Sequence, residues 1–203
     1  MVGKSQRLEK HSCSKNDVIN AALEVACREG WSRVRMMHLA SDLNVPLAQI
    51  LEQFRDMDAI ANAWFERVAL VLGEPVSKDF EAKSPSERLF EVMMRWFIAL
   101  EPYRKVSEDM IAGKLYPSHP HHWGPLVFSL SRLVHLFLDA ALINSHGRQR
   151  QAEELGVTVL IISTLRVWRR DQSDDYSSTR SHLRKKLVLG DRIMSRLFKA
   201  AQI

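Results

Sequence analysis

Three closely spaced histidines are the side chains with the clearest potential for metal chemistry: His119, His121 and His122. Neutral imidazole is a common ligand of transition metals, usually beside cysteine or carboxylate ligands at a regular spacing. No cysteine or acidic residue with such a spacing lies near these histidines, which share their segment with Pro117 and Pro120. We therefore predict an exposed, proline-rich loop that binds no metal.

A second group consists of aspartates that follow one another closely: Asp171, Asp174 and Asp175. A calcium loop also needs a glycine at its turn and a distal glutamate, and this segment has neither. We expect the carboxylates to offset neighbouring arginines, namely Arg169, Arg170 and Arg180. Because no glycine-rich phosphate loop and no Ser–His–acid arrangement is identifiable, we predict no catalytic residue, no cofactor and no enzyme activity.

Bulky aromatic and methionine side chains recur along the second part of the chain, where they form either an ordinary core or the wall of a ligand pocket. The pocket interpretation takes as its wall Met93, Trp96, Phe97, Met110, Trp123, Phe128, Phe137 and Trp168. Its polar anchors are Tyr103, His135 and Thr164. The ligand of such a pocket is an apolar small molecule or lipid, such as an isoprenoid, an acyl chain or an aromatic compound.

The composition is that of a globular protein, since 46% of the 203 residues are apolar and 26% are charged. Two cysteines, Cys13 and Cys27, are too few for a disulfide framework and favour a reducing cytosol. No apolar stretch approaches the roughly 20 residues of a membrane span, and the first 14 residues lack the apolar core of a secretory signal. We therefore expect a cytoplasmic protein.

Apolar side chains recur at helical spacing, and no Asn-Gly or Asp-Gly hairpin turn is present, so we predict an all-α fold. The first helix is expected over 15–29. Ser14 and Asp17 form a capping-box-like pair at its start, and Gly30 is suited to end it.

Two short helices, 36–43 and 46–54, are expected around a tight turn at Asn44-Val45, with Pro46 in the first position of the second helix. A helix over 56–72 follows, and Gly73 and Pro75 then begin a linker over 73–84. The remaining helices are expected at 84–100, 103–112, 126–144, 149–170 and 178–200.

This order of helices resembles the front of the TetR family of transcriptional regulators. The match rests on Ala21-Ala22-Leu23-Glu24, Gly30-Trp31, Leu39-Ala40, Leu43-Asn44-Val45, Ile50, Phe54 and Ile60. The resemblance implies a flexible basic arm over 1–14, a helix-turn-helix domain with its connecting helix over 15–72, and a helical ligand-binding and dimerisation domain over 73–203. The function that it implies is ligand-responsive regulation of transcription.

In that family the second short helix enters the major groove, so the resemblance implies double-stranded DNA as a partner. Residues 46–54 would then contact bases, with Leu47 near the start of the helix and Gln49 and Gln53 reading adenine edges. The expected contacts to the DNA backbone come from Arg33, Arg35, His38 and Arg55.

Several positions depart from that pattern. Pro46, Leu47, Leu51 and Met57 stand where the family commonly has a hydroxyl cap, a polar or basic residue, a tyrosine and a lysine. Segment 33–58 also carries three arginines against four acidic residues, whereas DNA binding depends on cationic contacts with phosphate. The helix-turn-helix is therefore either a DNA-binding unit or a packing unit alone.

A second resemblance supports the alternative in which the helix-turn-helix only packs and does not bind DNA. The last part of the chain is similar to the end of the lipid-binding accessory proteins of ubiquinone biosynthesis, which are a non-regulatory branch of the same fold. The similar residues are Thr164-Leu165, Trp168, Asp171, Ser173, Asp175-Tyr176, Thr179, Leu183 and Arg192. That branch implies lipid or isoprenoid binding without DNA contact. We keep it as the alternative to the regulator.

The last predicted helix is amphipathic, and its apolar face predicts a homodimer. The interface assigned to it comprises Leu183, Leu187, Gly190, Met194 and Leu197, with Leu133 from helix 126–144. Two alternatives remain open: packing on its own domain, and peripheral contact with an anionic membrane, because residues 146–203 carry 12 basic against 6 acidic residues. In a ligand-responsive dimer, helix 56–72 is the expected connecting rod between the two domains.

Overall fold

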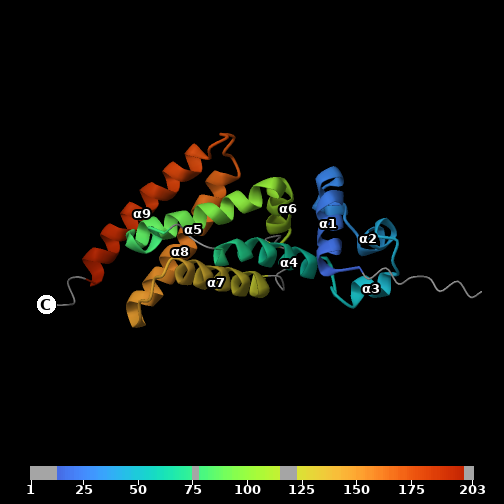
Figure 1. Cartoon of the computed structure of the whole chain (residues 1–203), viewed down its shortest axis with the longest axis horizontal. Helices are drawn as coiled ribbons and strands as arrows, with labels where there is room; N and C mark the ends of the chain where they lie inside the picture. Colours follow the sequence, from blue (N-terminus) through green and yellow to red (C-terminus); the bar gives the residue numbers. More distant parts are fainter. Residues whose placement is uncertain (1–12, 75–77, 115–122, 199–203) are drawn as a thin grey trace, which may run out of the picture. The chain divides into compact units, whose positions relative to one another are not determined.

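A computed structural model of the chain describes residues 13–74, 78–114 and 123–198, the first three residues of the last range by their backbone alone. Every regular element in these residues is a helix (Figure 1), which confirms the predicted all-α fold. The chain divides into two compact units, unit 1 up to Phe65 and unit 2 from Glu66 onward. The boundary falls inside a helix, whereas the sequence placed it after residue 72.

Unit 1 consists of α1 (Lys15–Glu29), η1 (Trp31–Arg33), α2 (Met36–Asp42), α3 (Leu47–Leu51) and the first part of α4 (Met57–Ala69). Both ends of α1 follow local rules. The Asp17 backbone N–H donates to the Ser14 hydroxyl at 3.2 Å, and the Ser14 N–H donates to the Asp17 carboxylate at 2.8 Å. This capping box satisfies two donors that a helix start otherwise leaves unpaired. Gly30, with φ 88°, turns the chain off the helix axis, so both predicted ends of α1 are confirmed.

The turn between α2 and α3 is closed by Asn44, which adopts a left-handed conformation with φ 51°. The Asn44 N–H donates to the Ser41 carbonyl at 3.1 Å, and the Val45 N–H donates to the Ala40 carbonyl at 3.0 Å. These bonds satisfy carbonyls that the end of a helix leaves open, so α2 stops here. The predicted helix-turn-helix is therefore present.

Two details of α3 differ from the sequence-based expectation. Pro46 is the residue before the helix and not its first residue, because its ψ of 142° is extended. The helix also ends at Leu51, earlier than the predicted end at Phe54. The Phe54 side chain is buried all the same, so it packs into the core from the segment that follows α3.

The core of unit 1 draws on each of its α-helices. Leu23 of α1, Leu39 of α2, Ile50 of α3 and Ile60 of α4 are all fully buried. Burial of such a side chain stabilises the fold by roughly 1.5–3 kcal/mol relative to exposure. Helices as short as α2 and α3 are not stable alone, so this packing holds them in place.

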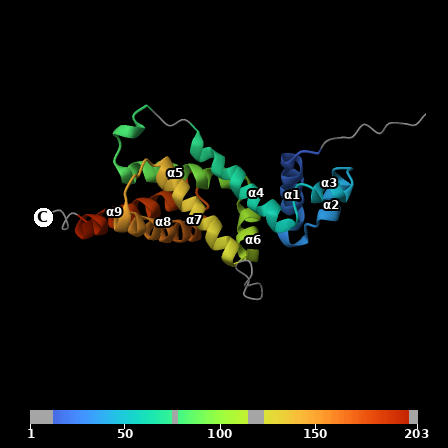
Figure 2. The same ribbon diagram turned by 90° about the horizontal axis from the view of Figure 1, so that it is seen from below.

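Unit 2 contains the end of α4 followed by η2 (Leu70–Gly73), η3 (Phe80–Ala82), α5 (Pro85–Leu100), η4 (Glu101–Tyr103), α6 (Arg104–Lys114), α7 (Trp123–Ala140), α8 (Gly147–Trp168) and α9 (Ser177–Phe198). Helices α8 and α9 pack side by side, and α5 packs against both α7 and α9 (Figures 1 and 2). The predicted helices of this region are present with shifted ends. The largest shift is in α7, which ends at Ala140 and not at residue 144.

The described residues of the segment predicted as a linker, 73–84, include an aromatic side chain that is buried in the core. Phe80 of η3 is 1% exposed, which places its ring in the core of unit 2. Ser84 and Glu87 then form a second capping box at the start of α5, with Pro85 in the first turn. The end of this segment is therefore part of the folded unit, because one aromatic side chain fixes it there.

Asp171 connects the end of α8 to the start of α9. Its carboxylate accepts the N–H and hydroxyl of Thr179 at 2.7 and 2.6 Å, and those of Ser173 at 3.2 and 2.5 Å. Burial acts to raise the pKa of Asp171, but these hydrogen bonds outweigh it and lower the pKa to about 2. The expectation that Asp171 offsets nearby arginines is wrong, because its oxygens are occupied by the α8–α9 connection.

Candidate nucleic-acid interface and ligand site

The side chains assigned to DNA differ in how accessible they are on unit 1. Arg33, Arg35, His38 and Arg55 are exposed, whereas Leu47, Gln49 and Gln53 are half-buried. The side chains of Arg33 and His38 make no hydrogen bond or ion pair within the described part of the chain. These two side chains can reach a ligand without breaking an existing contact.

Gln53 has a structural role that the sequence did not reveal. Its side-chain amide Nε2 donates to the Cys13 carbonyl at 2.7 Å and to the Gln49 carbonyl at 3.3 Å. The first of these bonds ties the chain just before α1 to the segment after α3. Reading an adenine edge needs the same amide group, so the interface proposed below leaves Gln53 out.

Two of the three arginines already hold partners. Arg35 Nη1 donates to the carbonyls of Ser32 and Val34 at 2.7 and 2.9 Å, which supports the backbone ahead of α2. Arg55 Nε lies 2.8 Å from Asp56 Oδ2, and the Arg55 side chain is 84% exposed. A surface ion pair of this kind contributes about 0–1 kcal/mol, so phosphate can replace the Asp56 carboxylate at little cost.

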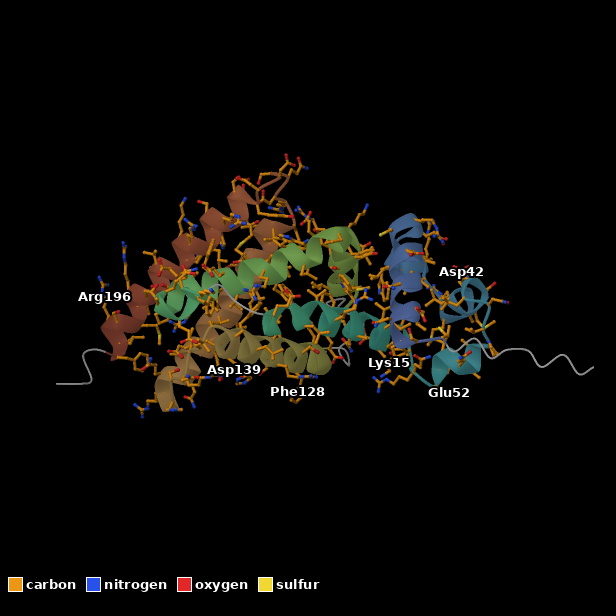
Figure 3. All side chains as sticks on the ribbon, in the orientation of Figure 1. Lys15, Asp42, Glu52, Phe128, Asp139 and Arg196 are labelled. Carbon is orange, nitrogen blue, oxygen red and sulfur yellow. The ribbon has the colours of Figure 1, made fainter. Side chains whose placement is uncertain are left out.

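Acidic and apolar side chains share the surface of α2 and α3 with these cations. Asp42 at the end of α2 and Glu52 directly after α3 are exposed (Figure 3), as are Met37 and Leu51. Carboxylates oppose phosphate, whereas apolar side chains can contact the methyl group of thymine. Sequence reasoning missed Met37, because a methionine at helical spacing is indistinguishable from a core residue without the fold.

In unit 2 the structure gathers four of the predicted pocket residues into an aromatic cluster: Trp96, Phe97, Phe137 and Trp168. The ring centroids of Trp96 and Phe97 are 5.2 Å apart, and those of Trp96 and Phe137 are 5.8 Å apart, both nearly edge to face. Phe97 and Trp168 are also separated by 5.8 Å. The buried residues Met93, Met110 and Thr164 belong to the same core.

Three polar atoms of this core have no hydrogen-bond partner in the described structure: Trp96 Nε1, Thr164 Oγ1 and Trp168 Nε1. Their residues are linked, because Phe97 contacts both tryptophan rings and Thr164 precedes Trp168 by one helical turn of α8. A buried polar group without a partner costs about 1–3 kcal/mol. The described residues therefore leave three hydrogen-bonding groups of this cluster unsatisfied.

The other predicted pocket residues are not part of the cluster. Phe128 is 75% exposed and projects outward from α7 (Figure 3). His135 is exposed, and its Nδ1 lies 3.0 Å from Arg150 Nη2 and 3.4 Å from Glu154 Oε1. Tyr103 is half-buried in η4, and the side chain of Trp123 lies outside the described residues. The sequence could not separate these residues from the core, since all share one apolar pattern.

Exposed apolar side chains form one face on each of the two last helices. On α8 they are Leu155, Val159 and Ile162, and on α9 they are Leu189, Ile193 and Leu197. Of the predicted interface, Leu197 is exposed, whereas Leu133, Leu187, Gly190 and Met194 are half-buried. Leu183 is fully buried within its own unit and cannot contact a second chain without rearrangement.

The described residues contain neither a metal-ligand group nor a membrane-spanning helix. Among the described residues, no group of three or more histidine, cysteine or acidic side chains could hold a metal ion. The predicted loop with His119, His121 and His122 lies outside the described residues, as does nearly all of the predicted arm over 1–14. No helix in the described ranges combines the length and apolarity needed to cross a membrane.

Two of the solved structures that are similar to this chain are TetR transcriptional regulators. A TetR transcriptional regulator from Nitrosomonas europaea ATCC 19718 is 32% identical, with a TM-score of 0.75, over 87% of this chain and 97% of that chain. A TetR transcriptional regulator from Rhodococcus sp. RHA1 is 18% identical, with a TM-score of 0.64, over 86% and 93%, and supports the fold alone. No family model and no curated protein matches the chain.

Proposed function

Since this chain belongs to the TetR family of transcriptional regulators, we propose that it binds double-stranded DNA as a homodimer and responds to a small ligand. The observation that carries this proposal is the α2–turn–α3 unit, closed at Asn44 and held by fully buried side chains, in a chain 32% identical to a solved regulator. We ascribe no catalytic activity to the chain and place it in the cytoplasm.

In the proposed complex, α3 is the helix that enters the major groove. Gln49 contacts an adenine edge, and Leu47 and Leu51 contact thymine methyl groups. Arg33, Arg35, His38 and Arg55 contact the DNA backbone, since all four are exposed. Base contacts therefore supply the sequence preference, and the arginines fix the register.

The small number of cations on the proposed DNA-binding surface sets how strongly DNA affinity should depend on salt concentration. Three arginines per subunit allow six phosphate contacts in a dimer, and each contact adds roughly −0.9 to the slope of log K against log salt. We therefore expect a slope of about −5 or shallower. The two exposed carboxylates, Asp42 and Glu52, should make this slope shallower still.

The proposed ligand is an apolar molecule that carries at least one hydrogen-bond acceptor. The indole N–H groups of Trp96 and Trp168 can only donate, and both are buried without a partner in the described structure. A carbonyl or ether oxygen between the aromatic rings would satisfy one of them. Thr164, the one predicted anchor that lies in this core, can donate or accept.

The proposed dimer uses the exposed apolar faces of α8 and α9. Leu155, Val159 and Ile162 recur every three or four residues on α8, so they share one side of that helix. Contiguous exposed apolar surface of this kind marks protein interaction sites. A twofold arrangement covers the same face on both subunits.

Helix α4 connects the proposed DNA-binding function of unit 1 to the proposed ligand-binding function of unit 2, because this one helix runs through both units. Its first part belongs to unit 1 and its last residues belong to unit 2. A ligand changes DNA affinity only by the difference in its affinity for the conformations of the dimer. We propose that a ligand bound in unit 2 biases the position of α4, and with it the helix-turn-helix.

The experiment that tests DNA binding is fluorescence anisotropy with the DNA that flanks the protein's own gene, over a range of salt concentrations. We expect Gln49→Ala to weaken binding about 5- to 150-fold, which corresponds to 1–3 kcal/mol for a lost base contact. Gln172→Ala, an exposed glutamine of unit 2, is the matched control and should bind like the parent protein.

The outcome without binding is also informative. If the parent protein does not bind this DNA even at low salt, the regulator proposal fails. The lipid-binding alternative would then be tested by native mass spectrometry of protein purified from its host. The 32% identical solved structure does not favour that alternative, since it is a transcriptional regulator.

A further inference from the structure

A pocket of about 400 Å³ in unit 2 is lined by Glu108 of α6 and by Arg166, Arg169 and Arg170 at the end of α8. Three of its four lining residues are cationic, and none is apolar. We propose that this pocket binds an oxyanion of the phosphate type. The site belongs neither to the aromatic cluster nor to the helix-turn-helix. Two of its residues, Arg169 and Arg170, are among the arginines that we expected the nearby aspartates to offset.

Two of the three arginines of the pocket carry positive charge that no described residue neutralises through an ion pair. Arg169 Nε lies 3.4 Å from Glu108 Oε2, which is the one ion pair recorded for these arginines within the described residues. The side chains of Arg166 and Arg170 make no ion pair or hydrogen bond there. With three cations against one carboxylate, the pocket has a local excess of two positive charges.

The aspartates next in sequence are engaged elsewhere. Asp171 accepts hydrogen bonds from Ser173 and Thr179, and Asp175 Oδ1 accepts the backbone N–H of Ser177 at 3.0 Å. Arg180, which was expected to pair with them, donates its Nε–H to the Asp175 carbonyl at 2.8 Å. Since Asp171 and Asp175 hold the α8–α9 connection, their carboxylates are not available to Arg166 and Arg170, and the side chains of these two arginines are open to an external anion.

The end of α8 gives the pocket a fixed frame. Trp168, between the arginines in sequence, is fully buried. Arg104 of α6 lies 5.1 Å from the Trp168 ring centroid and donates Nη1–H to the Trp168 carbonyl at 3.0 Å and also to the Asp171 carbonyl. Anchoring of this kind reduces the conformational entropy lost when an anion binds.

The chemistry of the lining residues points to phosphate. A guanidinium presents its N–H groups as a planar fork that matches two oxygens of a phosphate or a carboxylate. Glu108, which holds Arg169, opposes an anion without a proton. Hydrogen phosphate or a phosphate monoester monoanion can donate its O–H to Glu108 while its other oxygens accept from the arginines. The site therefore favours a protonated phosphate over chloride or a simple carboxylate.

The test is isothermal titration calorimetry of the full chain with inorganic phosphate and pyrophosphate at constant ionic strength. We expect saturable binding at about 1 mM or tighter, and a loss of at least tenfold in affinity in the Arg166→Gln/Arg170→Gln double variant. Arg148→Gln, at the opposite end of α8, is the matched control and should leave affinity unchanged. Glu108→Gln should reduce the preference of the site for phosphate over chloride, because it removes the carboxylate that accepts the phosphate O–H and opposes an unprotonated anion.

A parallel arm identifies the source of the phosphate group. Vesicles of phosphatidic acid, a phosphate monoester, and phosphatidylcholine are compared with vesicles of phosphatidylcholine alone, with circular dichroism as the check that each variant folds. Binding of either free phosphate or anionic vesicles that depends on Arg166 and Arg170 supports the site. Equal weakening in Arg148→Gln, or no saturable binding to either probe, overturns it. The arginines would then only interact favourably with the negative end of the α8 helix dipole.

Discussion

Thr164 and Thr179 are both fully buried threonines of unit 2, and they differ in one respect. The Thr179 hydroxyl donates to the Asp171 carboxylate at 2.6 Å, whereas the Thr164 hydroxyl has no partner in the described structure. A hydrogen bond to a charged group contributes about 1.5–3 kcal/mol, and an unpaired buried hydroxyl costs about 1–3 kcal/mol. The same substitution should therefore have opposite effects at the two positions.

We predict that Thr164→Val raises the free energy of unfolding by about 1 kcal/mol and that Thr179→Val lowers it by about 2 kcal/mol. Urea unfolding at pH 7 and fixed protein concentration measures both. The two variants control for each other, because each replaces a hydroxyl by a methyl group. A loss of stability in Thr164→Val would show that its hydroxyl has a buried partner, and would remove one support for the ligand site.

Asp171 predicts how stability depends on pH. Its pKa is lowered from 3.8 to about 2 in the folded protein, so the carboxylate stabilises the fold above about pH 4 and loses this effect as the pH falls toward 2. A shift of this size corresponds to about 2 kcal/mol. We expect Asp171→Asn to unfold more easily by this amount at pH 7, with the difference shrinking between pH 4 and pH 2.

Unfolding curves at pH 7, 4 and 2.5 measure this convergence. Asp174→Asn, an exposed neighbour in the same connection, is the control and should change stability by less than about 0.5 kcal/mol. A constant difference between Asp171→Asn and the parent protein at all three pH values would contradict the assignment, since it would mean that the carboxylate charge is not what stabilises the connection.

At the scale of elements, the end of α1 depends on a backbone conformation that only glycine adopts easily. Gly30 has φ 88° and ψ 146°, while a Cβ built there would meet no atom within 4 Å. The cost of Gly30→Ala therefore comes from the backbone alone. We predict a loss of about 1–3 kcal/mol, measured by thermal and urea unfolding.

Gly73→Ala is the matched control for this prediction. Gly73 also has open space around its Cβ position, but it does not have a positive φ. We expect its substitution to change the unfolding free energy by less than about 0.5 kcal/mol. Similar losses in both variants would mean that the conformation of Gly30 is not the source of the effect.

At the scale of the whole molecule, the dimer proposal concerns the exposed apolar faces of α8 and α9. Ile162 on α8 and Ile193 on α9 are each about half exposed in the single chain. Lysine at either position would place an unpaired charge in the proposed interface, which costs several kcal/mol. We predict that Ile162→Lys and Ile193→Lys each weaken dimerisation at least tenfold in sedimentation equilibrium.

The matched control for the dimer is Phe128→Lys on α7. Phe128 is more exposed than either isoleucine, but it lies on the helix that the sequence favoured as the partner of α9. An interface of α8 and α9 predicts no effect of Phe128→Lys on dimerisation. If Phe128→Lys dissociates the dimer and the isoleucine variants do not, the interface lies on α7.

The sequence by itself determined the features that depend on residues close to one another. The capping box of Ser14 with Asp17, the end of α1 at Gly30 and the turn at Asn44 were all predictable. Hydrogen bonds at helix ends join residues no more than a few positions apart, so the sequence contains their whole cause. The all-α fold and the family followed from the order of such elements.

Only the tertiary structure decided which faces of those helices are covered. Gln53, which the sequence predicted to contact DNA, donates to Cys13, which lies 40 residues earlier, and so it is a structural residue. Leu183 and Leu197 follow the same apolar pattern on α9, yet one is buried and the other exposed. The reason is physical: helical periodicity fixes which residues share a side, but burial depends on which helix packs there.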